Sequence, residues 1–184
     1  DDITNAHTIF GPDLANIRGK TARWAPTHVH TDIIEIPQQI LDNQRFLTLT
    51  ADIMFVNTVP FLVTSSRNIN LTTIEHAPTH TADKLGTLLH RVMNVYTHAG
   101  FTVQTILMDN EFEKLRDHGH HATLNTTASA EHVGDIERRI CVIKERCRGI
   151  ICTLPYTRLP HIMLIYLLHH VVLWLNNFPV DKGV

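Results

Sequence analysis

The sequence has few cysteines, no long apolar run and no excess of positive charge. There are three cysteines, Cys141, Cys147 and Cys152, and this odd number argues against a disulfide framework and favours reduced, intracellular thiols. No two of them form a C-x-x-C pair, which argues against a structural zinc site. The longest apolar run, at 162–175, is too short to span a bilayer, so no membrane is expected as a partner. The formal net charge is −2, so any contact with nucleic acid must come from local patches.

The chain also lacks an initiator methionine and a signal peptide, and it begins in a polar run. We expect it to be a piece of a longer polypeptide. With 184 residues, of which 43% are hydrophobic and 18% charged, it has the composition of one globular core. Residues 1–31 carry Gly11, Pro12, Gly19 and Pro26 and show little periodicity, so we interpret them as a basic linker or arm.

The apolar pattern predicts a mixed α/β core over 32–153. Runs rich in β-branched and aromatic residues predict five strands, at 46–57, 61–66, 71–75, 101–108 and 122–125. Apolar spacings of three and four residues predict three helices, at 81–98, 134–148 and 161–176, and a brief polar helix or turn is expected at 111–117. The turn at 57–60 implies an antiparallel hairpin, and the strand-helix-strand segment implies a parallel pair.

The helix expected at 134–148 organises the rest of the interpretation. Its apolar residues recur on one face of a 3.6-residue period, at Val133, Ile136, Ile140, Ile143, Cys147 and Ile151. A neighbouring stripe holds Glu137, Cys141, Lys144 and Arg148, with the carboxylate near the start of the helix and two cations below it. Its basic end is a candidate contact for phosphate.

Three carboxylates stand out by position. Asp52 lies within an apolar strand and Asp109 ends another, so side-by-side pairing of these strands would bring both to one sheet edge, where the helix supplies Glu137. Crowded carboxylates repel each other unless a hard divalent cation such as Mg²⁺ or Mn²⁺ lies among them. Ordinary roles also remain open: Asp52 paired with Arg67, Asp109 capping the 111–117 turn, and Glu137 as a favourable first-turn acid.

Short motifs resemble the catalytic core of retroviral and retrotransposon integrases. GDIER at 134–138 resembles the G-x-x-E-R of that family, DNEF at 109–112 is similar to its D-N-G-x-E-F, and FLVTSSR at 61–67 resembles its second strand. ADIMFVN at 51–57 and IKER at 143–146 are similar more particularly to Pol polyproteins of long-terminal-repeat retrotransposons.

This resemblance covers roughly residues 45–150 and implies a ribonuclease H-like fold, a mixed five-stranded sheet flanked by helices. It implies a metal-dependent polynucleotidyl transferase that processes the 3′ ends of its element's DNA and joins them to target DNA. Asp52, Asp109 and Glu137 would be catalytic and would hold two Mg²⁺ (or Mn²⁺) ions. Three basic residues would contact DNA, namely Arg138, Lys144 and Arg148.

The expected partners are DNA, both the element ends and the target, and further copies of the chain. The location would be intracellular, and nuclear for a eukaryotic element. Residues 154–184 form the last predicted unit, whose apolar helix packs on the core or on a dimer partner. Its apolar residues lie nearly all round the cylinder, so we expect cover on most sides.

The sequence also departs from the family pattern. The glycine expected after Asp109 and Asn110 is missing, and the 27 residues between Asp109 and Glu137 are fewer than is usual. Cys141 stands where a basic residue often follows the catalytic glutamate. An alternative is therefore an inactive remnant of the same fold that binds nucleic acid or protein, and a third is a ribonuclease H or transposase-type nuclease.

The first carboxylate has a rival as well. Asp32 in His30-Thr31-Asp32 resembles the H-T-D of some copia-type integrases. We favour Asp52 because it lies in the stronger strand and at a more suitable distance from Asp109. Glu131 competes less well with Glu137, since it precedes the expected helix and lacks the G-x-x-E-R setting.

Overall fold

The structure is a computed structural model, and it describes residues 5, 8–9, 11, 35–79, 81–109, 112, 114–115, 122–125, 129–155 and 158–178, without the side chains of 129–133. The arm predicted at 1–31 lies almost wholly outside these residues, as does much of the polar helix predicted at 111–117. The proposed unit boundaries remain predictions.

Five strands form one mixed sheet in the order β3-β2-β1-β4-β5. Their bounds are β1 Phe46–Val56, β2 Val59–Ser66, β3 Thr72–His76, β4 Thr102–Met108 and β5 Thr123–Asn125. β1, β2 and β3 pair antiparallel, whereas β4 pairs parallel with both β1 and β5. Both kinds of pairing expected from the sequence are confirmed.

A two-residue turn joins β1 to β2. Asn57 and Thr58 have φ angles of 47° and 66°, and Val56 lies opposite Val59 as the ladder closes. Positive φ at both central residues is typical of the type I′ turn, whose twist matches that of the flanking strands. The turn predicted at 57–60 is confirmed, and it fixes the register of β1.

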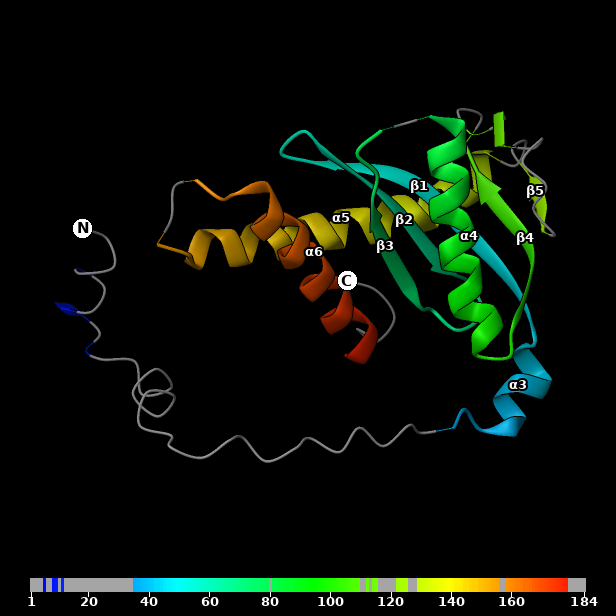
Figure 1. The fold of residues 1–184 in the computed structure, drawn as a ribbon. Helices are drawn as coiled ribbons and strands as arrows, with labels where there is room; N and C mark the ends of the chain where they lie inside the picture. Colours follow the sequence, from blue (N-terminus) through cyan, green and yellow to red (C-terminus); the bar gives the residue numbers. More distant parts are fainter. Residues whose placement is uncertain are drawn as a thin grey trace.

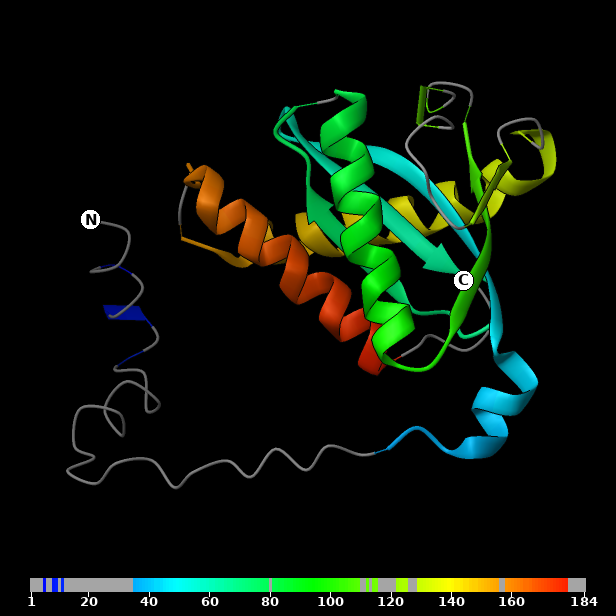
Figure 2. The ribbon, with the colours of Figure 1, turned by 45° about the vertical axis from the view of Figure 1, so that its right-hand side comes forward.

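Helices cover both faces of this sheet (Figure 1). Within the described residues, the helices with defined bounds are α3 Gln38–Gln44, α4 Ala82–His98, α5 Ser129–Thr153 and α6 His161–Asn177. α4 lies on one face, while α5 runs across the other and α6 packs beside α5 and against β3 (Figures 1 and 2). The sequence did not predict α3, a seven-residue helix whose two apolar residues are adjacent and form no stripe, although Leu41 is partly buried against the hydrophobic core.

Each face of the sheet has its own core. Beneath α4, residues of β1 and β4 pack against the apolar face of that helix, including Leu49, Ile106 and Leu89. The second core joins β1, β2 and β3 to the predicted apolar face of α5, whose buried members are Ile136, Ile140, Ile143 and Cys147. Burial raises the pKa of the Cys147 thiol above its usual range, so this cysteine is a neutral core residue.

α6 is covered on fewer sides than the sequence led us to expect. It buries Leu164, Leu168, Val171, Val172 and Leu175 in the second core. Five of its large apolar side chains are exposed, namely Ile162, Met163, Tyr166, Leu173 and Trp174. Within the described part of the chain, no helix combines the length and the apolar character needed to cross a membrane.

Candidate active site

Two aspartates lie next to each other where β4 ends. The last residue pair of the parallel ladder between β1 and β4 joins Ala51 to Met108. Asp52 directly follows Ala51, and Asp109 directly follows Met108, so this register makes the two aspartates neighbours across strands that are about 4.8 Å apart. The predicted side-by-side pairing of the two strands is confirmed, while the catalytic role of the aspartates stays a prediction.

Strand alternation directs both aspartates to the sheet face that α5 covers. Ala51 and Met108 pack in the core beneath α4. Successive side chains of a strand point to opposite faces, so Asp52 takes the other face, as does Met54 in the core beneath α5. The same alternation carries Asp109, the first residue after β4, toward that face.

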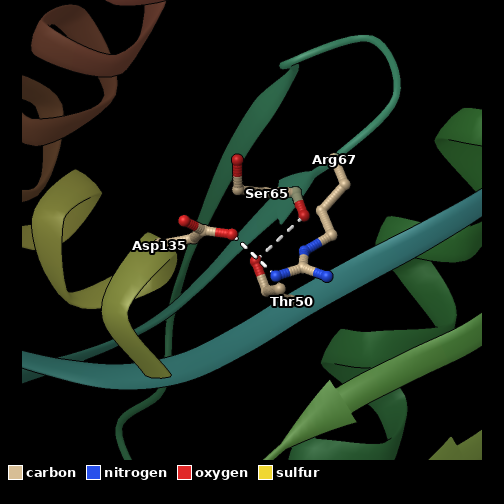
Figure 3. Close-up of polar contacts among 4 residues, drawn as sticks. All are labelled: Thr50, Ser65, Arg67 and Asp135. Carbon is tan, nitrogen blue, oxygen red and sulfur yellow. Dashed lines mark hydrogen bonds and ion pairs between the residues drawn. The ribbon is translucent and has the colours of Figure 1, made fainter. Parts of the chain in front are cut away.

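An ion pair holds the first part of α5 against this region (Figure 3). Nη2 of Arg67, which follows β2, donates a hydrogen bond to Oδ2 of Asp135 on α5 at 2.7 Å. Beside it, the Thr50 hydroxyl donates to the carbonyl oxygen of Ser65 at 3.2 Å, which ties β1 to β2 at the same level. The start of α5 is thus placed over β1 and next to the end of β2.

The two flanks of α5 face different neighbours. Successive helix residues are about 100° apart, so Asp135 and Glu137 lie on opposite sides of the buried Ile136. Asp135 lies on the side of α5 that faces β2, because it pairs with Arg67. Further along the same side of the helix, Arg146 and Ile150 line a cavity shared with α6, and α6 packs against β3. Since β4 lies on the other side of β1, Glu137 occupies the flank toward β4 and the aspartate pair.

The three predicted carboxylates do not form a closed metal site. Among the described residues, no group of three or more His, Cys, Asp or Glu side chains is close enough to hold a metal ion. Asp52 is half-buried and its Oδ1 accepts a hydrogen bond from the Ile53 amide at 2.7 Å, whereas Asp109 and Glu137 are exposed. The aspartate pair still fits a hard cation, because it offers carboxylate oxygens from two adjacent strands.

The predicted basic residues divide between two sides of α5. Because α5 is continuous from Ser129 to Thr153, Lys144 and Arg148 share the flank of Glu137, two and three turns further along. Lys144 is half-buried and Arg148 is exposed. Arg138 is also exposed, but it lies about 200° from Ile136 and therefore points away from the sheet. Of the three predicted DNA contacts, Lys144 and Arg148 therefore lie on the same side of α5 as Glu137, and Arg138 does not.

The alternatives to Asp52 and Glu137 lie outside the described side chains. Asp32, the alternative first carboxylate, lies outside the described residues, and so does the side chain of Glu131. The sequence interpretation missed the ion pair, because it considered Arg67 only as a partner of Asp52. Opposite charges in the SSR and GDIER motifs were the available signal, and their pairing became visible only when α5 was placed over the sheet.

The strand order, the mixture of parallel and antiparallel pairs and the helices on both faces define the ribonuclease H-like fold of integrase cores. The structure is similar to the catalytic core domain of BIV integrase, with a TM-score of 0.53 and 19% identity over 74% of this chain and 86% of that one. Two structures of the HTLV-2 integrase catalytic core in complex with magnesium, a trimeric and a dimeric form, each have a TM-score of 0.52.

The first of these HTLV-2 structures has 14% identity over 76% of this chain and 90% of that one, and the second has 13% over 77% and 92%. At such identities the likeness concerns the fold alone. The sequence matches no family model and no curated protein.

Proposed function

We propose that this chain is the catalytic core of a retroelement integrase, with the Pol polyprotein of a long-terminal-repeat retrotransposon as its source. Its reactions would be hydrolysis at the 3′ ends of the element's DNA and transfer of those ends to target DNA. The observation that carries the proposal is the β1–β4 register, which makes Asp52 and Asp109 neighbours on the face beneath α5. The integrase-like fold supports it.

Each residue has a distinct task in this proposal. Asp52 and Asp109 would supply oxygen ligands from two strands, and Glu137 would complete the set from the facing flank of α5. Bound Mg²⁺ or Mn²⁺ would activate the attacking oxygen and stabilise the leaving one. Lys144 and Arg148 would pair with DNA phosphates along the same flank, and because phosphates carry no base information, their loss would weaken binding evenly across sequences.

The test is a strand-transfer assay with a duplex that carries the element's end. Asp52→Asn, Asp109→Asn and Glu137→Gln should each reduce the product by at least about a hundredfold, because each removes a ligand whose charge cannot be replaced. Glu145→Gln is the matched control, since Glu145 is an exposed acid on the same helix. Transfer at the wild-type rate by Asp109→Asn would refute the assignment, and cleavage of an RNA–DNA hybrid alone would favour a ribonuclease H.

A second candidate is an inactive remnant that binds nucleic acid or protein. It is favoured by the absence of a three-carboxylate group among the described residues and by the 27-residue segment between Asp109 and Glu137. Calorimetric titration with Mg²⁺ and Mn²⁺ separates the two. Binding that is lost in Asp52→Asn and Asp109→Asn supports the enzyme, whereas a folded wild-type chain that binds neither ion is a remnant.

A further inference from the structure

A cavity of about 310 Å³ lies between the second half of α5 and the end of α6. Its lining includes Arg146 from α5, three ring-bearing residues at positions 170, 174 and 178, and three aliphatic residues, Ile150, Val171 and Leu175. Arg146 belongs to the flank of α5 opposite to Glu137. The cavity is therefore separate from the predicted catalytic carboxylates, and its volume suits one small ring system.

The three rings form a continuous row along one side of α6. His170 and Trp174 have centroids 6.1 Å apart in an edge-on arrangement, and Trp174 and Phe178 are stacked at 4.7 Å. Trp174 is 53% exposed and Phe178 is 62% exposed. Because the two rings stack on each other, each has one face covered, and a further ring would contact the surface that remains exposed. Exposed aromatic rings in succession are the usual stacking platform for the bases of single-stranded nucleic acid.

The charge beside the rings favours a phosphate-bearing ligand. Between residues 138 and 148, α5 carries five cations and only one acid, Glu145, although the whole chain has a net charge of −2. Arg146 brings one of these cations to the cavity, and none of its described lining residues is acidic. A guanidinium offers a planar fork of donors that matches phosphate, whereas the aliphatic lining residues and the rings suit a base.

We propose that the α5–α6 cavity binds single-stranded nucleic acid, with a base stacked on the Trp174–Phe178 row and the adjoining phosphate paired with Arg146. The site does not depend on the proposed integrase activity, because it shares no residue with the carboxylates. It would be present in an active enzyme and in a remnant alike.

Tryptophan fluorescence tests this directly, because the chain has only two tryptophans. In the full chain carrying Trp24→Phe, Trp174 is the only one left. A ten-nucleotide oligo(dT) should quench its emission saturably. The same-length strand without bases should bind on the order of tenfold more weakly, since stacking supplies the difference. Circular dichroism checks that each variant is folded.

Two variants identify the contacts in that background. Arg146→Gln should weaken oligo(dT) binding and lower the slope of log affinity against log salt by about one, as expected for one lost phosphate contact. Phe178→Leu should weaken binding without changing that slope. Lys84→Gln, which removes an exposed cation from α4 on the other sheet face, is the matched control and should change neither.

Several outcomes would overturn the proposal. These are the absence of quenching by oligo(dT), equal quenching by the strand without bases, equal affinity for a duplex of the same length, and an Arg146→Gln variant with unchanged affinity. Quenching by an acidic peptide but not by oligo(dT) would identify a protein-docking surface instead.

Discussion

Asn176 fastens α6 to the open edge of the sheet, and its removal should destabilise the whole core. β3 is an edge strand, and Thr72 at its start is only 1% exposed. The Asn176 side chain accepts a hydrogen bond from the Thr72 amide at 2.9 Å and donates one to the Thr72 carbonyl at 2.8 Å. The amide thus occupies the place that a further strand would take.

The size of the effect follows from these two bonds. A protein hydrogen bond contributes about 1 kcal/mol net, and a buried backbone group left without a partner costs about 1–3 kcal/mol. Asn176→Ala removes both partners of a buried backbone site, so we expect a loss of about 2–3 kcal/mol. For a chain of this size that corresponds to a fall in Tm of roughly 5–10 °C.

Equilibrium unfolding in urea measures the loss, with circular dichroism as the signal. Asn177→Ala is the matched control, because Asn177 is exposed and its side-chain amide donates to the Leu173 carbonyl of its own helix, the one hydrogen bond of that amide within the described residues. It should cost less than about 0.5 kcal/mol. If both variants unfold at the same urea concentration, the bonds of Asn176 add nothing and apolar packing alone holds α6 in place.

Two further predictions concern single polar contacts. A double-mutant cycle with Arg67→Gln and Asp135→Asn, measured by urea unfolding, should give a coupling free energy of about 0.3–0.5 kcal/mol, because the two side chains are 34% and 67% exposed. Salt at about 1 M should remove this coupling. A coupling of zero at low salt would show that the ion pair does not contribute to stability. Burial raises the pKa of Tyr96 well above its usual range, so stability that is complete below about pH 10 should fall by about 1.4 kcal/mol per pH unit above it. Tyr96→Phe should lack this alkaline loss of stability. It should cost only about 1 kcal/mol at pH 7, because the Leu71 carbonyl that loses the Tyr96 hydroxyl still accepts a hydrogen bond from the Ser66 amide. Equal alkaline slopes in the wild type and the variant would contradict this prediction.

The sheet and its main helices could be predicted from the sequence because their patterns are local. The strand runs rich in β-branched and aromatic residues, the turn at 57–60 and the apolar face of α5 each depend on residues close together in the chain. The pairing of β1 with β4 required one step more, namely the rule that a strand-helix-strand segment makes a parallel pair. α3 lacked such a signal, since its only apolar residues are adjacent and show no helical spacing.

The site was less predictable because it depends on orientation. Periodicity indicated that Ile136 faces a core, but it could not tell which flank of α5 faces β4. The ion pair of Asp135 with Arg67 fixes which side of α5 faces β2 and which faces β4, and the two residues are 68 positions apart in the sequence. The exposure of Tyr166 and Trp174 was also missed, because an apolar composition does not reveal how much of a helix its neighbours cover.

The short segment between Asp109 and Glu137 has less influence on the position of Glu137 than the sequence suggested. Glu137 does not stand at the end of a loop, since α5 begins at Ser129 and Glu137 is two turns inside it. Its position is therefore set by what docks the helix, namely the burial of Ile136 and the pairing of Asp135 with Arg67. A trimmed segment does not by itself keep Glu137 from the aspartates. The ion pair of Asp135 with Arg67, on the flank opposite to Glu137, is one of the contacts that hold the first turns of α5 where they lie.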